Sequence, residues 1–310
     1  MSAPALSGST PKIELSSFAA GSLDERGANA MNIRSKTTEC FLKRRAWIAG
    51  ACFLSISLVA AKVPTDKPNG GESQARARAI LASMAEFLSK TPRMSVTVHG
   101  AYDAVQPNGS KVEWNEIRKI ALRRPDQLRV DAERSDGARS LILFDGKNIT
   151  AFDESRQVYA QAAQPGGVDQ TVIHFVRDMG MRLPLAVLLL SRLPEELQTR
   201  VQTVAYVERT TTLGVPAHHL AGRTDTVDFQ LWIADSDKPL PVRAVLTYKN
   251  APGQPQFRAG FEDWDLAANL SDSMFTFTPP AQSHRIPFAS ALPHIGFASR
   301  SAPAKRGTKQ

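Results

Sequence analysis

Residues 112–159 read VEWNEIRKIALRRPDQLRVDAERSDGARSLILFDGKNITAFDESRQVY, and apolar and polar side chains alternate along much of this stretch. Two turn sequences, Arg124-Pro125-Asp126-Gln127 and Asp145-Gly146-Lys147-Asn148, divide it into three alternating segments. Asp-Gly favours a hairpin because both residues tolerate a positive φ. Pro125 sets φ for a turn and has no amide hydrogen to offer a neighbouring strand. The stretch therefore predicts an antiparallel sheet.

One face of this sheet is expected to be apolar. Side chains alternate across a strand, so residues of one parity share a face. The apolar parity around the first turn comprises Val112, Trp114, Ile120, Leu122, Leu128 and Val130. Charged residues such as Glu113, Lys119 and Arg129 take the other parity. The sheet is thus predicted to be half-buried, and what covers its apolar face bears on function.

Composition and charge exclude one large class of function. The chain has 310 residues, 42% of them hydrophobic and 22% charged, which is typical of a globular protein with a sizeable core. The net charge of +8 would fit nucleic-acid binding, but residues 62–280 carry 26 basic and 26 acidic groups. All the basic surplus lies in the two tails, so we expect no nucleic-acid partner.

The N-terminal region indicates export. Lys43-Arg44-Arg45 precedes an apolar stretch over residues 46–61, which is shorter than the roughly 20 residues of a membrane span and resembles a secretory signal. We interpret residues 31–61 as a signal peptide starting at Met31, or as an N-terminal anchor, and residues 1–30 as a start-site extension or a disordered segment. Both cysteines, Cys40 and Cys52, precede residue 62. A cysteine-free product suits a periplasm, so we predict a Gram-negative periplasmic protein.

The rest of the chain predicts one α+β domain over residues 73–288. A linker over 62–72 is followed by a helix that ends before Pro92, a strand over 94–105 and the three segments described above. Helical spacing returns between 164 and 193, with a second helix beginning at Pro184, and residues 201–264 alternate again. A solvated turn is expected at Glu195-Glu196. We predict a curled antiparallel sheet of nine to eleven strands, with helices covering its concave face, and a disordered basic tail over 289–310.

No group of residues predicts catalysis or metal binding. His218 and His219 are neighbours on a strand and point to opposite faces, so they cannot readily share an ion. Asp235 and Asp237 suit a turn better than a calcium loop, because the longer ligand series is missing. The sequence also lacks a nucleophile elbow, a phosphate-binding glycine loop and a His-Glu-x-x-His helix. We therefore expect no enzymatic activity, no metal and no cofactor.

The apolar strand residues admit two interpretations. Trp114, Trp232 and Trp264 all fall on strands of what is expected to be one large sheet, and large twisted sheets curl. Such a sheet either fills its interior with side chains or encloses an apolar cavity for a ligand. Periodicity alone favours the filled core.

Several short strings resemble known families of exported proteins. Leu122-Arg123-Arg124-Pro125, the string from Leu143 to Lys147 and Phe275-Thr276-Phe277-Thr278-Pro279-Pro280 resemble, in the same order, elements of the periplasmic lipoprotein carrier family LolA. The last of them resembles its closing strand. A closer resemblance, over about residues 73–288, is to a domain-of-unknown-function family of predicted periplasmic proteins with a LolA/LolB-like fold. The similar strings are Leu183-Pro184-Leu185-Ala186, Gly214-Val215-Pro216 with His219, the string from Asp228 to Ile233, and Pro239-Leu240-Pro241.

The resemblance implies an incomplete barrel with helices over an apolar cavity, and a non-enzymatic carrier or binder of a lipid, an acyl chain or a lipoprotein. Cavity contacts would come from Trp114, Ile120, Leu122, Leu128, Val130, Leu185, Leu188, Leu189 and Trp232. Arg123, Arg124 and Arg129 would meet an anionic headgroup. The alternative is an envelope-stress or protein-interaction module with an envelope protein partner and the same fold. In either case we expect a monomer.

Overall fold

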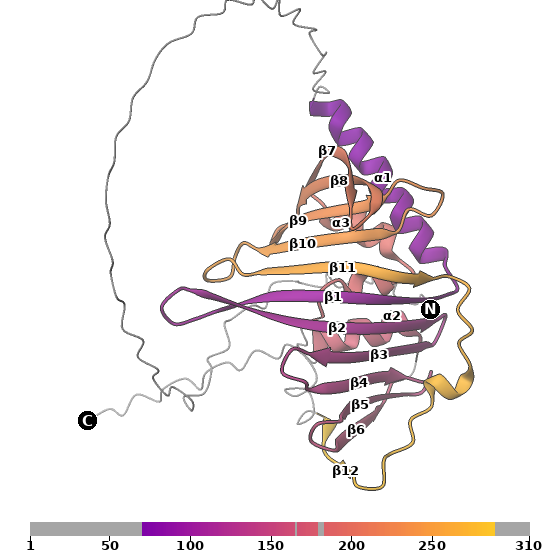
Figure 1. Cartoon of the computed structure of the whole chain (residues 1–310). Coiled ribbons are helices and arrows are strands. Elements are labelled where there is room, and N and C mark those ends of the chain that lie inside the picture. Colours follow the sequence, from indigo (N-terminus) through magenta and orange to yellow (C-terminus); the bar gives the residue numbers. More distant parts are fainter. Residues whose placement is uncertain (1–69, 165, 179–182, 289–310) are drawn as a thin grey trace, which may run out of the picture. The chain divides into compact units, whose positions relative to one another are not determined.

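The computed structural model describes residues 70–164, 166–178 and 183–288. Within these residues twelve strands form one sheet (Figure 1). The strands are β1 Arg93–Val105, β2 Lys111–Arg123, β3 Gln127–Arg134, β4 Arg139–Phe144, β5 Asn148–Asp153, β6 Val158–Ala163, β7 Thr203–Thr212, β8 Val215–Arg223, β9 Val227–Ala234, β10 Pro241–Tyr248, β11 Gln256–Asp265 and β12 His284–Arg285. All neighbours pair antiparallel except β12, which runs parallel to β6.

The sheet is open, with the order β12-β6-β5-β4-β3-β2-β1-β11-β10-β9-β8-β7. Two runs of strands consecutive in the chain, β1 to β6 and β7 to β11, meet in the middle. There β1 pairs with β11, and Val98 lies opposite Phe261. The predicted fold class is therefore confirmed. The protein has an α+β fold with a large antiparallel sheet that is not closed into a barrel. The strand count is twelve rather than nine to eleven.

The extra strands arise at two turns that were not predicted. Asp136-Gly137 separates β3 from β4, and Gly137 has φ +81°, so this turn carries the same Asp-Gly signal as the one at Asp145-Gly146. The turn before Val158 separates β5 from β6. Its Gln157 has φ +55°, a conformation that glycine and asparagine adopt more readily. The residue type at this position therefore does not indicate a turn.

The register across the Pro125 turn places the predicted apolar residues on one face. Leu122 lies opposite Leu128 and Ile120 opposite Val130. At the second turn, Asp145 Oδ1 accepts hydrogen bonds from the backbone amides of Lys147 and Asn148 at 2.8 and 2.7 Å. This side chain closes the turn in the way that favours aspartate at such positions.

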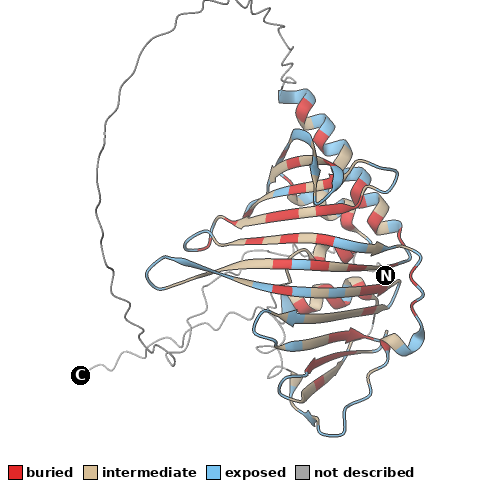
Figure 2. Cartoon of the chain, in the orientation of Figure 1, coloured by how far each residue is buried: buried red, intermediate tan, exposed pale blue. Residues whose placement is uncertain are grey.

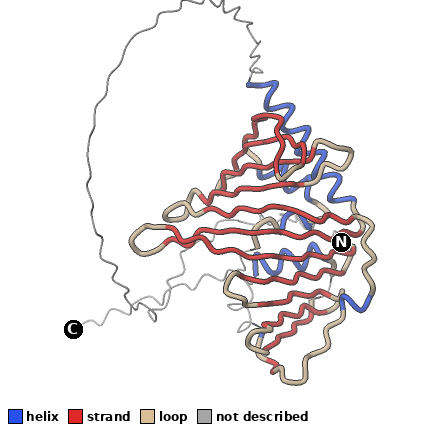
Figure 3. Tube along the Cα trace, viewed as in Figure 1, coloured by secondary structure: helices blue, strands red, loops and turns tan. Residues whose placement is uncertain are grey.

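The helices are α1 Gly70–Lys90, α2 Val168–Ile173, the π-helix η1 His174–Asp178, the 3-10 helix η2 Ala186–Leu189, α3 Leu193–Arg200 and the 3-10 helix η3 Asp272–Phe275. Figures 1 and 3 show α1, α2 and α3 on the same side of the sheet. On α1 the side chains of Ala77, Leu81, Met84 and Leu88 are buried, which is the three- and four-residue spacing of a helix packed on one side. Since α1 begins at Gly70, the last residues of the expected linker over 62–72 are helical.

Two expectations about the connecting segment are wrong. The helix expected from Pro184 is a single turn, because Leu185 has φ +64° and Leu190 is extended, which leaves only Ala186–Leu189 helical. The solvated turn expected at Glu195-Glu196 is the first turn of α3, which also contains Pro194. Proline suits a first helical turn, and acidic residues there are favoured by the helix dipole.

The prediction of a closing strand at Phe275–Pro280 is also wrong. Phe275 ends η3, the following residues up to Ser283 are not in a strand, and the short β12 comes only at His284–Arg285. Pro279 and Pro280 lack amide hydrogens, so this string could not form a regular ladder. Phe275 instead packs on the outer face of the sheet, in a cluster with Ala121, Leu143, Ala268 and Leu270.

The main core lies between the sheet and its helices. Figure 2 shows buried positions alternating with more exposed ones along the central strands, which is the period of a sheet covered on one side. The predicted extension over 1–30, the signal over 31–61 and the tail over 289–310 lie outside the described residues. Among the helices of the described ranges, none has both the length and the apolarity needed to cross a membrane.

Candidate binding cavity

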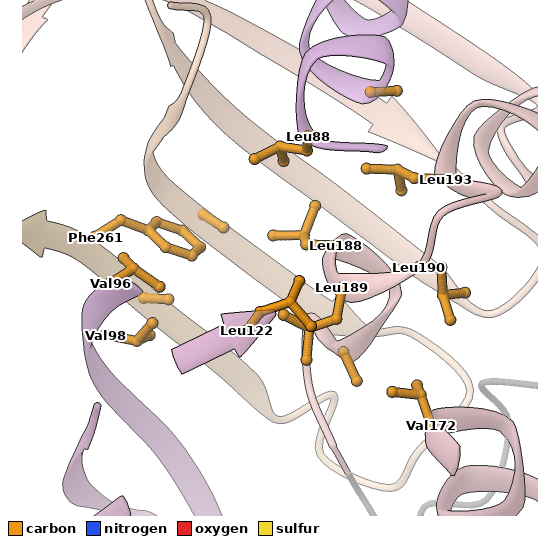
Figure 4. Close-up of a cluster of buried hydrophobic side chains, with 14 of the residues drawn as sticks. Leu88, Val96, Val98, Leu122, Val172, Leu188, Leu189, Leu190, Leu193 and Phe261 are labelled. Carbon is orange, nitrogen blue, oxygen red and sulfur yellow. The ribbon is translucent and has the colours of Figure 1, made fainter. Parts of the chain in front are cut away.

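A cavity of about 80 Å³ lies between the sheet and the segment that contains η2. Figure 4 shows Leu188 and Leu189 of η2 gathered around the same space as Val98 and Phe261 of the sheet. The lining residues are Met94, Val96, Val98, Arg118, Ile120, Leu128, Val130, Ala132, Ser140, Ile142, Val172, Phe175, Leu183, Pro184, Leu185, Ala186, Leu188, Leu189, Phe257, Phe261 and Trp264. The interior of the fold is therefore not completely filled.

The size and chemistry of the cavity favour an apolar occupant. Its volume exceeds the space that one water molecule needs, but a water also requires two or more polar partners, and this wall offers few. Typical pockets for drug-sized ligands measure roughly 300–1,000 Å³, so the cavity in this conformation takes only a small group or the end of a chain.

Cross-strand pairing builds the sheet side of the cavity. Val96 lies opposite Ile120, Ile120 opposite Val130, and Val130 opposite Ile142, so one row of branched aliphatic side chains crosses four strands. Each member is an inward position of its own strand. The period-two pattern of the sequence therefore places these side chains on the wall directly.

The helical side of the cavity is an irregular segment tied to α2. The amide of Leu188 donates to the carbonyl of Leu185 at 2.9 Å, and that of Leu190 donates to Val187 at 3.1 Å. Just beyond, the Asp169 carboxylate of α2 accepts hydrogen bonds from the amide and the hydroxyl of Ser191 at 2.9 and 2.7 Å. These bonds hold the leucines of η2 against the sheet.

Six of the nine apolar residues expected at the site line the cavity. They are Ile120, Leu128, Val130, Leu185, Leu188 and Leu189. Leu122 is fully buried in the core, and Trp114 lies on β2 opposite Tyr102 of β1. Trp264 lines the cavity but was not among the expected contacts, and its Nε1 donates to the carbonyl of Pro241 at 3.0 Å.

Trp232 was expected to line the cavity, but it is not among the lining residues. Its ring stacks on His219, with 4.1 Å between the ring centres. Its neighbours Leu231 and Ile233 are buried, so strand alternation turns Trp232 to the outer face. His218, next to His219, lies instead beside Tyr206 and Asp235, and its Nε2 is 3.1 Å from Asp235 Oδ1.

The three arginines expected at a headgroup bind other parts of the protein. Arg123 pairs with Asp272 and donates to the carbonyl of Leu270 at 2.9 Å. Arg129 pairs with Asp131 at 2.7 Å and donates to the carbonyl of Met274 at 3.0 Å, so both arginines hold the C-terminal segment on the outer face.

Arg124 has a different structural position. Its Nε donates to the carbonyl of Thr91 at 3.1 Å, just after α1, and its Nη1 is 3.8 Å from Asp169 Oδ1 of α2. Burial lowers the pKa of this guanidinium, and the charge of Asp169 opposes that effect. Arg124 thus links the turn after β2 to two helices.

A buried ion pair at one end of the cavity was missed. Arg118 is part of the lining, and its Nε is 2.7 Å from Glu116 Oε1; the side chains are 14% and 4% exposed. Burial raises the pKa of Glu116, and the charges of Arg118 and Arg134 oppose this. A signal was present in the sequence, because Glu116 and Arg118 interrupt the apolar parity that runs from Val112 to Leu122.

Glu196, in the segment where a solvated turn was expected, has ionic partners within the fold. Glu196 pairs with Arg192 at 3.0 Å and with Arg200 at 2.7 Å. Within the ranges that the structure describes, no group of three or more His, Cys, Asp or Glu side chains is placed to hold a metal ion.

Comparisons with solved structures give matches of low sequence identity and low TM-score. A conserved protein from Thermus thermophilus is 12% identical, with 68% of this chain and 99% of that chain covered and a TM-score of 0.41. The lipoprotein LppX of Mycobacterium tuberculosis is 13% identical, with 64% and 100% covered and a TM-score of 0.40. A LolA superfamily protein of Nitrosomonas europaea is 12% identical, with 65% and 97% covered and a TM-score of 0.34. Among curated proteins, none matches the sequence.

The sequence itself matches one family. Residues 77–289 match the family described as predicted periplasmic protein, DUF2092, and they span most of the chain, including every strand. This description agrees with the export expected from the N-terminal sequence. The chain belongs to the DUF2092 family of predicted periplasmic proteins.

Proposed function

We propose that the protein is an exported, non-catalytic binder or carrier of a lipid, an acyl chain or a lipoprotein. The proposal rests on the cavity between the sheet and residues 183–189, whose wall is almost entirely aliphatic and aromatic. Ile120, Val130 and Leu188 would contact the apolar part of the ligand. Arg123, Arg124 and Arg129, which were expected to bind a headgroup, bond to other parts of the fold, so the proposal gives them no contact with the ligand.

Apolar burial supplies the free energy for such binding. Each methylene removed from water contributes about 0.8 kcal/mol, so even a short length of acyl chain binds without polar contacts. The present volume holds only the end of a chain. A longer chain would move Leu188 and Leu189 away from the sheet, and contacts with the ligand would replace the contacts that these leucines lose.

The first test is whether protein isolated from a periplasm carries lipid. We expect mass spectrometry of an organic extract to detect an amphiphile at a constant ratio to protein, and the delipidated protein to take up a fluorescent fatty acid saturably. Protein without extractable lipid and without saturable uptake would contradict the proposal.

A pair of neighbouring substitutions locates the binding in the cavity. Ala132 lines the cavity, so Ala132→Phe fills it, whereas Glu133 is exposed and points to the outer face of the same strand. We expect Ala132→Phe to weaken fatty-acid binding by about tenfold or more, which corresponds to about 1.4 kcal/mol. Glu133→Phe should bind like the wild type, and equal losses in both variants would show that uptake occurs elsewhere.

Protein binding is the second candidate function. Three of the exposed large apolar side chains, Val207, Leu213 and Val215, belong to the β7–β8 hairpin, and β7 is the last strand in the sheet order. Strands at the edge of a sheet can pair with another chain. A lipid-free protein that cross-links to one envelope protein, and loses that cross-link in Leu213→Asp, would favour this function.

A further inference from the structure

The wall of the cavity contains one charge. Of the described residues that line it, only Arg118 is ionised, and all others except Ser140 are apolar. A guanidinium in such surroundings is costly unless it is paired, and here the carboxylate of Glu116 is its partner at 2.7 Å. The fold therefore keeps a buried cation beside an apolar space.

Cross-strand register places small side chains on one side of Arg118. Arg118 lies opposite Val98 on β1 and Ala132 on β3, and Ala132 lies opposite Ser140 on β4. The adjacent rows toward η2 hold larger aliphatic groups, such as Ile120 and Val130. The wall of the cavity thus combines a guanidinium, beside the small side chains of Ala132 and Ser140, with apolar groups such as Ile120 and Phe261, which matches the polarity of an amphiphile.

Glycine makes the space for Glu116. Gly100 is its partner on β1, and a Cβ at that position would lie 3.2 Å from Glu116 Cγ and 3.3 Å from Oε1. Those distances are tighter than ordinary contacts. The absence of a side chain at Gly100 therefore lets the carboxylate lie beside the Arg118 guanidinium.

A second cation stands beside Glu116. Arg134 is its partner on β3 and bonds to Asp136, while Tyr102 of β1 and Asp153 of β5 are the other ionisable groups in this electrostatic neighbourhood. Glu116 can therefore leave Arg118 without losing every neighbouring positive charge. Burial raises the pKa of Glu116, which favours proton uptake by this carboxylate when a ligand anion takes its place beside Arg118.

We infer that Arg118 binds the carboxylate of a long-chain fatty acid whose chain enters the cavity, and that Glu116 pairs with Arg118 while the cavity is empty. Arginine suits this role because its planar fork matches a carboxylate. The inference rests on the proposed function and adds to it the charge of the ligand and its orientation. It also assigns anion binding to Arg118, in place of the three arginines that bind elsewhere.

The test compares laurate with the uncharged alcohol of the same chain length, by displacement of a neutral fluorescent dye at mildly alkaline pH. We expect the wild type to bind laurate about tenfold more tightly than the alcohol. Arg118→Met should lose that preference and keep its affinity for the alcohol. Glu116→Gln should bind laurate several-fold more tightly, because the competing carboxylate is gone.

Two further variants keep the result interpretable. If Arg118→Met does not fold, the double variant Glu116→Gln/Arg118→Met removes both charges together and should bind the two ligands equally. Arg129→Met, on the outer face, should retain the preference of the wild type.

The outcomes separate this inference from the proposed function. Equal affinities of the wild type for laurate and the alcohol, or a preference that survives in the double variant, would overturn the role of Arg118 and leave apolar binding intact. Binding of neither ligand would refute the proposed function as well. Tighter binding of lauryl phosphate than of laurate would replace the carboxylate with a phosphate headgroup.

Discussion

At the scale of single residues, Asp103 connects three parts of the central sheet. Its carboxylate lies on β1 and accepts hydrogen bonds from Arg258 Nη1 at 2.9 Å and from the backbone amide of Gln256 at 3.0 Å, both on β11. Lys111 of β2 is 3.6 Å away. Burial raises the pKa of Asp103, but these hydrogen bonds and charges outweigh it and hold the pKa below its usual value.

We expect Asp103→Asn to destabilise the protein in a pH-dependent way. A carboxylate with a lowered pKa in the folded state stabilises that state above its unfolded pKa, and this contribution disappears as pH falls through the folded pKa. The free energy of unfolding should fall by about 2 kcal/mol at pH 7. Denaturant titrations of both proteins should show the difference shrinking below about pH 4. A loss that is the same at every pH would contradict the ionic role.

At the scale of elements, the first turn of α1 is joined to the edge strand β7 by one hydroxyl. Ser73 Oγ donates to the carbonyl of Tyr206 and accepts from the amide of the same residue, both at 3.1 Å. An edge strand otherwise presents unpaired backbone groups, and here a helix side chain satisfies two of them. Arg76 adds a contact over the Tyr206 ring at 3.8 Å.

Removal of this hydroxyl should loosen β7 from α1. In Ser73→Ala both backbone groups of Tyr206 lose their partner, at a cost of about 1–3 kcal/mol. Hydrogen exchange should show faster exchange of the Tyr206 amide. Ser89→Ala is the matched control, since the Ser89 hydroxyl bonds only to Glu86 of its own helix. Unchanged exchange at Tyr206 would show that packing alone holds the strand.

At the scale of the whole molecule, the sheet carries apolar clusters on both faces. The main core lies under the helices, and a smaller cluster lies on the outer face under the C-terminal segment, where Phe275 is buried. Arg123 and Arg129 hold that segment through the carbonyls of Leu270 and Met274. The outer cluster and the candidate binding cavity thus lie on different faces of the sheet.

This separation predicts that a change in the outer cluster alters stability without altering binding. Phe275→Ala should lower the free energy of unfolding by about 3–5 kcal/mol, because it leaves a cavity in the outer cluster. Fatty-acid binding below the unfolding temperature should stay at the wild-type value. Its effect should also add to that of Leu88→Ala in the main core, since distant sites with no shared partner behave independently. A binding defect in Phe275→Ala would contradict the separation.

The sequence alone determined the properties that depend on neighbouring residues, namely where most strands and helices lie and which face of a strand is apolar. Period-two alternation identified most strands and the inward parity that includes Ile120 and Val130, and helical spacing identified α1. The errors came where a local signal was overridden or absent. Leu185 has a positive φ although it is not a glycine, so the early interruption of the helix expected from Pro184 could not be predicted. Pro279 and Pro280 lie in a segment that forms no strand, although a strand was expected there.

The tertiary structure alone decided which inward residues meet and where space remains between them. Trp232 and the arginines at 123, 124 and 129 were plausible contacts until register and packing gave them other partners. The pairing of β1 with β11 joins residues more than a hundred positions apart, and it brings Phe261 and Trp264 to the cavity. A pattern in the chain specifies the face on which a side chain lies. Whether that side chain meets a helix, a void or a buried charge such as Arg118 depends on contacts between segments distant in sequence, which no local pattern encodes.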